Sequence, residues 1–472
     1  ACGYKALADN TTANYNTAVG YNSLLVSTTG AYNTAIGAQA MDANTTGQYN
    51  TVVGLNALGT NTTGDKNTAI GAGALQANTT ADNNTAVGYD ALVANTVGTG
   101  NVAVGYLSLD ANTEGNYCTA VGMHALTTNT TGIDNTGVGY GALYSNTTGQ
   151  DNVGCGKQAL YENTTASNNT ACGDRAAQGN TTGSSLTAVG KDAMYSNSTA
   201  AGNTGVGHAA LYKNATGTEN VAIGMYAGRY NNNASYNVSV GYEALRGSSD
   251  AAPNSGGYNT AVGTHAQEDR TSGTTNTACG YKALRNGTTG NQNSGFGEDA
   301  GQDITTGSNN QCIGHNAGGS NSPSGQITTG SNNFVLGDNN IANLYCADTS
   351  ISSSDARDKT DVKDFNHGLS WITSLRPVTY RWDKRSWYDN GTPDGSKKRA
   401  RIHVGFLAQE AIEVEKKHGY ADEKDNMLVV NQNEDLRNPS YGYKYERLVP
   451  VLVNAIKELS AEVTALKAQI NN

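Results

Sequence analysis

A serine-rich stretch in the C-terminal part of the chain holds the residue types best suited to chemistry. Ser354 stands five residues before Lys359, and a serine with a lysine nearby can carry out acyl transfer. The serine hydroxyl is a weak nucleophile until a base takes its proton, and a lysine is such a base only where burial lowers its pKa. By itself this spacing is weak support, because Ser354-Asp355 before charged residues is also typical of a helix N-cap.

The seven cysteines indicate neither a disulfide framework nor a zinc site, because no Cys/His grouping has the spacing that zinc requires. Four of them occupy a repeated position that elsewhere holds Val or Ile: Cys2, Cys155, Cys172 and Cys279. Cysteine at such a position behaves as a small hydrophobic residue, so we expect these side chains to be buried. We therefore expect no metal and no cofactor.

The other candidates for chemistry or binding are scattered. His124, His208 and His265 have no periodic carboxylate or serine partner, and we interpret them as surface residues. Two carboxylates from distant repeats or from other chains could still form a glycosidase-type pair, which stays open as an alternative. The basic run at 397–401 fits a charged hairpin or loop tip better than a nucleic-acid contact, which needs a larger cluster of Lys and Arg.

A short sequence repeat determines which elements can position these side chains. The glycine that ends Thr17-Ala18-Val19-Gly20 recurs at Gly37 and Gly54, and this constant step of seventeen runs unbroken from Gly3 to Gly241. The next glycine of the series is Gly263, five places later than the period requires. Three regular steps follow, and a last step with six extra places leads to Gly337. Such regular periodicity predicts a solenoid, in which each repeat is one coil stacked on the next.

Each repeat contains two short apolar runs, such as Ala18-Val19 and Ala40-Met41, separated by Gly, Asn, Thr and Asp. Since nothing recurs at a spacing of 3.6 residues, we interpret both runs as short parallel strands. Runs such as Asn44-Thr45-Thr46-Gly47 predict the corners, because Asn and Gly tolerate positive φ. The sequence therefore predicts a mostly β protein with a parallel β-solenoid, of about twenty coils at roughly 4.8 Å each.

Composition divides the chain in two. Residues 1–350 hold 52 of the 58 glycines and carry 11 Lys+Arg against 22 Asp+Glu, whereas residues 351–472 carry 19 against 18. A mildly acidic repeat region is a poor partner for nucleic acid, and no apolar run approaches the ~20 residues of a membrane span. Because the chain opens on Ala1 inside a repeat, we expect it to be part of a longer protein.

Two insertions and several tyrosines are the candidate recognition features of the repeats. Extra residues near 247–253 and 321–325 are rich in turn formers and should form loops, which are either recognition sites or tolerated surface insertions. Tyrosines recur at fixed repeat positions, as at Tyr15, Tyr32 and Tyr49. Their rings could hold sugars or could pack between chains, and the sequence leaves both open.

The repeats resemble a known family. Blocks of the form Asn-Thr-Ala-Val-Gly-Tyr are similar to the head repeats of trimeric autotransporter adhesins, although those heads use a shorter repeat than this chain. The resemblance implies a left-handed parallel β-roll with three chains around an axis. One coil buries only a few small apolar groups against an ordering cost of roughly 1–2 kcal/mol per residue, which also favours several chains packed side by side.

Three motifs follow the repeats in a fixed order: 375–380, 403–410 and 445–452. They read Leu-Arg-Pro-Val-Thr-Tyr, His-Val-Gly-Phe-Leu-Ala-Gln-Glu and Tyr-Glu-Arg-Leu-Val-Pro-Val-Leu. This series resembles the C-terminal intramolecular chaperone of phage tail spikes and fibres, of which endosialidase tail spikes are the best-known carriers. The resemblance covers 352–472 and implies a trimeric folding clamp that cuts itself off after assembly.

The resemblance also implies roles for single residues. Ser354 would be the nucleophile, Lys359 its general base, and the bond between Ser353 and Ser354 would be cleaved. Asp355 and Arg357 would either orient this pair or serve only local structure. The implied activity is a serine/lysine peptidase that acts in cis, with no external substrate.

The last predicted helix carries an apolar seam spaced 4, 3, 4, 3 and 4 residues, which is a heptad pattern. Its members are Leu452, Ile456, Leu459, Val463, Leu466 and Ile470. Ile or Val at one seam position with Leu at the other favours two strands, whereas the resemblance implies three. We expect three, because the helix is short and the body before it should determine the number of chains.

We therefore predict a trimeric β-solenoid stalk over 1–345, a linker with the cleavage site over 346–353, and an α+β chaperone domain over 354–472 that ends in a coiled-coil helix. The function that this organisation favours is a phage tail fibre or tail spike for host attachment. Its expected partners are two further copies, a host-surface glycan or protein receptor, and tail or baseplate proteins, without nucleic acid or membrane insertion. It would be assembled in the host cytoplasm and located in the virion tail. The alternatives are a bacterial or prophage-encoded trimeric adhesin with the same chaperone, and a tail spike that degrades polysaccharide.

Overall fold

A computed structural model describes residues 1–249, 254–341, 359–385, 388, 392–432 and 441–471. The chain divides into two compact units. The first comprises Ala1–Gly319 with Gln326–Asp338, and the second comprises Ser320–Gly325 with Asn339–Asn472.

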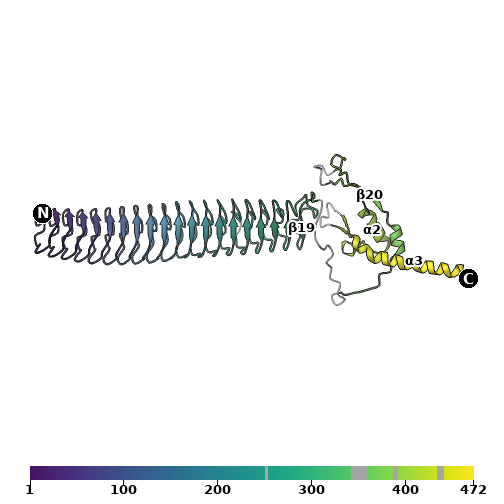
Figure 1. Cartoon of the computed structure of the whole chain (residues 1–472), viewed down its shortest axis with the longest axis horizontal. Helices are drawn as coiled ribbons and strands as arrows, with labels where there is room; N and C mark the ends of the chain where they lie inside the picture. The colour runs from purple at the N-terminus through teal and green to yellow at the C-terminus, as the bar shows by residue number, and fades with distance from the viewer. Residues whose placement is uncertain (250–253, 342–358, 386–387, 389–391, 433–440, 472) are drawn as a thin grey trace. The chain divides into compact units, whose positions relative to one another are not determined.

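The first unit is a stack of coils in which each coil contributes one three-residue strand to a single 19-stranded parallel sheet. Every strand pairs in register with the strand of the next coil, as Ala18 does with Ala35. Figure 1 shows these strands as one row of arrows along the stack. The strands are β1 (Thr17–Val19), β2 (Thr34–Ile36), β3 (Thr51–Val53), β4 (Thr68–Ile70), β5 (Thr85–Val87), β6 (Val102–Val104), β7 (Thr119–Val121), β8 (Thr136–Val138), β9 (Val153–Cys155), β10 (Thr170–Cys172), β11 (Thr187–Val189), β12 (Thr204–Val206), β13 (Val221–Ile223), β14 (Val238–Val240), β15 (Thr260–Val262), β16 (Thr277–Cys279), β17 (Ser294–Phe296), β18 (Gln311–Ile313) and β19 (Phe334–Leu336).

The predicted mostly β architecture with one parallel coil per repeat is confirmed, but the prediction of two strands per coil is wrong. The second apolar run of each repeat is a tight turn instead. In the third coil, Asn56 and Leu58 have φ values of 54° and 49°, so both lie in the left-handed region. A narrow coil has to reverse direction within a few residues, and an extended run there would be too straight.

The core of each coil is a thin column of small side chains. The central strand residue, such as Ala18, is fully buried, as are the Ala and Leu of the turn, such as Ala57 and Leu58. Buried asparagines form a second column, in which Asn78 donates from Nδ2 to Oδ1 of Asn61 at 2.8 Å. These bonds satisfy polar groups that a coil of this width cannot expose to water.

The glycine after each strand allows neighbouring coils to approach. Gly105 has a φ of 143°, which side chains of L-residues rarely adopt, and a Cβ there would lie 2.5 Å from the carbonyl oxygen of Gly122. Only glycine fits between backbones that are this close. This explains why the glycine, more than any apolar residue, marks the repeat.

The two insertions leave the strand ladder intact. Val238 pairs with Thr260 across the first insertion, and Gln311 pairs with Phe334 across the second. The predicted loop of the first insertion includes residues 250–253, which lie outside the described residues, so it stays a prediction.

A buried arginine accompanies the first insertion. Arg270 occupies a position of the asparagine column and donates from Nη2 to Oδ1 of Asn231 at 3.0 Å and from Nη1 to the carbonyl oxygen of Gly256. Burial lowers the pKa of Arg270 to about 10, which leaves the guanidinium charged at neutral pH. The longer side chain reaches an asparagine that is 39 residues away, beyond the span of a shorter amide.

The second unit is a small α/β region that ends in a helix. Its elements are α1 (Leu369–Ser374), β20 (Val378–Tyr380), β21 (His403–Gly405), α2 (Ala408–Lys417), the 3-10 helix η3 (Lys424–Asn426), β22 (Val430–Gln432), β23 (Tyr441–Tyr443), the 3-10 helix η4 (Tyr445–Arg447) and α3 (Leu448–Ile470). β20 pairs with β21 and β22 with β23, both antiparallel, while α1 packs against α3. Trp371 of α1 is fully buried in the core of this unit. Within the described residues, no helix has both the length and the apolar character needed to cross a membrane.

Candidate functional site

The residues predicted to cleave the chain fall mostly on a segment that is not described. Ser353, Ser354, Asp355 and Arg357 lie outside the described residues, so the nucleophile, the scissile bond and the orienting groups stay predictions. Lys359 is described, and its side chain is exposed in the single chain. The burial that would make this lysine a base is therefore not supplied by the described part of one chain.

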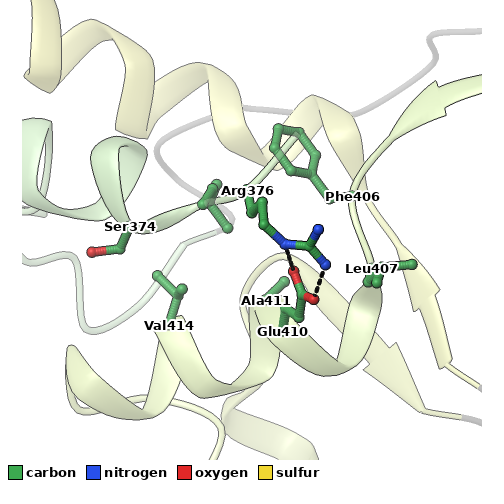
Figure 2. Close-up of a pocket in the computed structure, with 8 residues that line it drawn as sticks. Ser374, Arg376, Phe406, Leu407, Glu410, Ala411 and Val414 are labelled. Carbon is green, nitrogen blue, oxygen red and sulfur yellow. Dashed lines mark hydrogen bonds and ion pairs between the residues drawn. The ribbon is translucent and has the colours of Figure 1, made fainter. Parts of the chain in front are cut away.

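Two of the three C-terminal motifs meet in a bidentate ion pair. Arg376 follows α1, and Glu410 lies in the first turn of α2. Arg376 donates from Nε to Glu410 Oε2 at 3.1 Å and from Nη2 to Glu410 Oε1. Figure 2 shows the planar guanidinium lying against the carboxylate, with Phe406 and Leu407 beside it. The hydrogen bond from Arg376 lowers the pKa of Glu410, so the pair stays ionised at neutral pH.

The cavity at this ion pair is too small for a ligand. It is lined by Ser374, Leu375, Val414 and Ala411 in addition to the residues above, and its volume is about 10 Å³. A volume near 10–15 Å³ holds about one water molecule. We therefore interpret Arg376 and Glu410 as a structural connection between α1 and α2, a role that the motif spacing alone did not reveal.

A buried carboxylate joins α2 to the segment before β22. Glu415 is fully buried, and its oxygens accept hydrogen bonds from the backbone N–H groups of Leu428, Val429 and Val430 at 2.7, 2.8 and 2.9 Å. Three such donors satisfy a carboxylate that would otherwise be costly to bury. Sequence analysis missed Glu415, because a glutamate in an amphipathic helix is usually exposed.

Helix α3 has two apolar faces, of which one is used within the chain. Leu448, Val451 and Ala455 are buried. All six residues of the predicted seam are exposed, from 42% for Leu452 to 81% for Ile470. A helix that presents a heptad seam to solvent lacks its partner helices in the single chain. The coiled coil and the number of chains stay predictions.

The strand face of the solenoid carries a row of outward-pointing apolar side chains. The third residue of every strand points away from the core and is apolar. We call these nineteen side chains the apolar stripe: Val19, Ile36, Val53, Ile70, Val87, Val104, Val121, Val138, Cys155, Cys172, Val189, Val206, Ile223, Val240, Val262, Cys279, Phe296, Ile313 and Leu336.

The apolar stripe corrects the prediction for the cysteines. Cys155, Cys172 and Cys279 are exposed, as is Cys2 at the equivalent position of the first repeat. Successive residues of a strand point to opposite faces, so the second strand residue is buried and the third is not. The prediction failed because it treated the two apolar residues of each strand, such as Ala18 and Val19, as one buried pair.

Tyrosines that recur at one repeat position stack on one another along the solenoid. Tyr32 lies between Tyr15 and Tyr49, with ring centroids 4.9 and 5.0 Å apart and nearly parallel planes. Both faces of Tyr32 are therefore covered by neighbouring rings, and a sugar at this position would meet only ring edges and hydroxyl groups. The stacking is a third use of these residues, beside the sugar contact and chain packing considered above.

The interpretation of His265 as an isolated residue is wrong. Its Nδ1 atom lies 3.0 Å from Glu268 and 3.4 Å from Glu243. These three side chains place possible ligand atoms within 4.8 Å of one another. Glu268 is however also paired with Arg246 at 2.9 Å and with Arg285 at 2.8 Å, so its charge is already balanced by guanidinium groups. The cluster therefore favours an ion-pair network beside the first insertion over a metal site.

Comparisons with known proteins concern the second unit. Residues 354–420 match the family model described as chaperone of endosialidase. The matched range includes α1, β20, β21 and α2, and with them both members of the Arg376–Glu410 pair. Searches of curated proteins and of solved structures gave no match. A β-solenoid followed by a region similar to the chaperone of endosialidase fits an endosialidase-type tail fibre with a C-terminal chaperone.

Proposed function

We propose that the chain forms the stalk of a trimeric phage tail fibre or tail spike that attaches to the host surface. Its C-terminal region would assemble three chains, guide their folding and then detach by cleaving the bond between Ser353 and Ser354. The observation that carries the proposal is the match of 354–420 to the chaperone family, C-terminal to a stack of similar coils that forms a 19-stranded sheet. The exposed seam of α3 supports the oligomeric part of it.

The repeat itself explains why such a stalk needs a folding aid. Neighbouring coils are so alike that a strand can pair one coil out of step with almost the same contacts, and long-range parallel pairing is slow to form. A domain that holds three chains at a common height removes this ambiguity. Once the coils have stacked, the domain is no longer required for register.

The proposed cleavage uses groups of this chain alone. Ser354 Oγ attacks the carbonyl carbon of Ser353 while Lys359 takes the hydroxyl proton, and the amide nitrogen of Ser354 is protonated as the peptide bond breaks. Water then hydrolyses the resulting ester and leaves fragments 1–353 and 354–472. Because Lys359 is exposed in the single chain, its burial and the loss of its proton would come from the assembled trimer.

Intact mass measured after expression tests the cleavage and its position at once. The wild-type chain should give masses for 1–353 and 354–472, whereas Ser354→Ala and Lys359→Ala should each give one full-length mass. Ser352→Ala is the matched control and should still be cleaved after Ser353. Cleavage of Ser354→Ala at the same bond would remove Ser354 as the nucleophile.

A truncated chain tests the folding role separately. Residues 1–353 expressed alone should be insoluble or aggregated, while uncleaved Ser354→Ala should be soluble and contain three chains by light scattering. The second chain separates folding from cleavage, since it keeps the domain and lacks the nucleophile. Soluble trimers of 1–353 in normal yield would contradict the chaperone role.

Attachment is tested with the cleaved stalk. Fluorescently labelled stalk should bind to cells of the host strain and lose that binding when surface glycans or proteins are removed enzymatically. Incubation with the same surface polysaccharide should release no new reducing ends. Release of such ends would identify a polysaccharide-degrading spike instead.

A further inference from the structure

The apolar stripe keeps an apolar side chain at the same outward-facing position of every coil. All nineteen positions hold Val, Ile, Cys, Phe or Leu, and none holds a charged or polar amide residue. The residue two places further on, by contrast, is Tyr21 in one coil, Lys157 in another and Glu298 in a third. An outward-facing position that stays apolar in all nineteen strands gains nothing from contact with water, so the stripe indicates a contact that extends over the whole stack.

The stripe is large enough for a stable protein interface. Members such as Val121, Val189 and Ile223 are 37%, 38% and 43% exposed in the single chain. At roughly 50 Å² of apolar surface each, nineteen residues present on the order of 1,000 Å², against the ~800 Å² that each partner contributes to a standard interface. Apolar patches of more than a few hundred Å² generally mark an interaction site.

The geometry of the stripe selects its partner. Its side chains recur at the spacing of parallel strands, about 4.8 Å, over roughly 85 Å. A partner that covers every member must offer apolar groups with the same spacing over the same length. A second copy of this chain at the same height has apolar groups with that spacing and length, whereas a copy shifted along the stack leaves the ends of the stripe exposed.

We propose that the apolar stripe is the face through which three copies of the solenoid pack, parallel and in register, around a common axis. The inference rests on the proposed trimer and adds which surface joins the stalks. Parallel helices packed through the seam of α3 would hold the chains in the same direction. The stripe would then be buried along the full length of the stalk, while the turns stay at the outer surface.

Native cysteines of the chain can report on whether the apolar stripe is buried between copies. Cys155 and Cys279 belong to the stripe and are exposed in the single chain, whereas Cys118 and Cys312 are buried inside the coils. Burial raises the pKa of Cys118 and Cys312 to about 11, which lowers their reactivity further. In the proposed assembly, Cys155 of one copy lies at the same height as Cys155 of each neighbour.

The decisive experiment is cross-linking of the full-length assembly with a short bis-maleimide. Each of its two maleimide groups adds one thiol, so it joins two chains whose cysteines lie close together. The test chain keeps Cys155 as its single stripe thiol and carries Cys2→Ser, Cys172→Ser, Cys279→Ser and Cys346→Ser. We expect covalent dimers in denaturing gels. The matched control adds Cys155→Ser and Thr80→Cys, which moves the thiol to an exposed turn, and should give at least tenfold less dimer.

The two proposals fail in different ways. A trimer by light scattering in which the Thr80 thiol cross-links and Cys155 does not would overturn the packing face and leave the trimer intact. A single chain by light scattering would overturn both.

A charge on the stripe gives a second test that does not depend on thiol reactivity. Val121→Asp should lower the temperature at which the assembly dissociates, while Thr80→Asp, with the same charge on a turn, should leave it within a degree of wild type. Circular dichroism at low temperature checks that both variants keep their coils. Equal dissociation temperatures for the two variants would overturn the proposal.

Discussion

Two side chains of the second unit each make several hydrogen bonds at once. Glu415 binds three consecutive backbone N–H groups, and Arg376 binds both oxygens of Glu410. The two interactions differ in burial, because Glu415 is inaccessible to water and Glu410 is 41% exposed at its side chain. Hydrogen bonds to a buried charge contribute more than those at the surface, so Glu415 is the residue on which the unit depends more strongly.

Replacing Glu415 should therefore destabilise the second unit. Glu415→Ala leaves three buried N–H donors without an acceptor, and we expect a loss of about 3 kcal/mol or more. Hydrogen exchange of the Leu428–Val430 amides in the full chain measures it locally, and exchange should become at least a hundredfold faster. Glu413→Ala, an exposed neighbour paired with Lys416 at 3.0 Å, is the control and should leave these amides protected. Equal exchange in both variants would contradict the role of Glu415.

The ion pairs of Glu268 should make the stability of the solenoid depend on pH. Burial opposes ionisation of Glu268, but the hydrogen bond from Arg285 and the charges of Arg246, Arg285 and His265 outweigh it and lower the pKa of Glu268. A carboxyl with a depressed folded pKa stabilises the fold above its unfolded pKa, roughly 4.3, and loses that contribution as the pH falls through the lower folded value.

The thermal midpoint of the wild type should thus fall between about pH 5 and pH 3 more steeply than that of Glu268→Gln. Glu114→Gln, at an exposed position, should follow the wild-type curve. A set of melting curves across this pH range checks the prediction, and parallel curves for wild type and Glu268→Gln would refute it.

At the scale of the coil, the backbone itself limits what the repeat can hold. Gly105 and Gly100 both have positive φ, 143° and 69°. A Cβ on Gly105 would meet the carbonyl oxygen of Gly122 at 2.5 Å, whereas one on Gly100 would meet the ring of Tyr117 at 2.8 Å. A backbone carbonyl in the strand ladder cannot move without breaking the pairing of two coils, but an exposed tyrosine can turn aside.

Gly105→Ala should accordingly be much more harmful than Gly100→Ala. We expect a loss of about 3 kcal/mol or more for the first, and about 1–2 kcal/mol for the second from its left-handed backbone alone. Limited proteolysis shows where the stack opens, with new cleavage near the altered coil in Gly105→Ala only. Equal proteolysis of both variants would mean that the close approach of the coils is not limiting.

At the scale of the whole molecule, the expected trimer depends on side chains that a single chain leaves exposed. In α3 the buried face is used within the second unit, and the seam through Leu459 is not. Leu459→Asp places three carboxylates together at the proposed axis, where each would lose its water. We expect the assembled mass of an uncleaved Ser354→Ala chain to fall from three chains to one.

Light scattering of the purified protein measures this change. Lys457→Asp, an exposed substitution beside the seam, is the control and should keep three chains. A trimer that survives Leu459→Asp would show that the seam of α3 is not needed to hold the three chains together.

The sequence alone was sufficient for the coil and its period, because the constant spacing of Gly20, Gly37 and their successors implies coils of equal length outside the two insertions. It was also sufficient for the order of the C-terminal motifs. These are properties of neighbouring residues, and local backbone chemistry decides them.

Only the tertiary structure decided which apolar residues form the core. In the strand Ala18 points inward, so alternation turns Val19 outward, while the tight reversal converts the second apolar run into a left-handed turn. The structure also brought together Arg376 with Glu410, and His265 with Glu243, from separate segments. Hydrophobicity shows that a residue avoids water, but the direction in which the chain bends decides whether its own coil or another surface covers it.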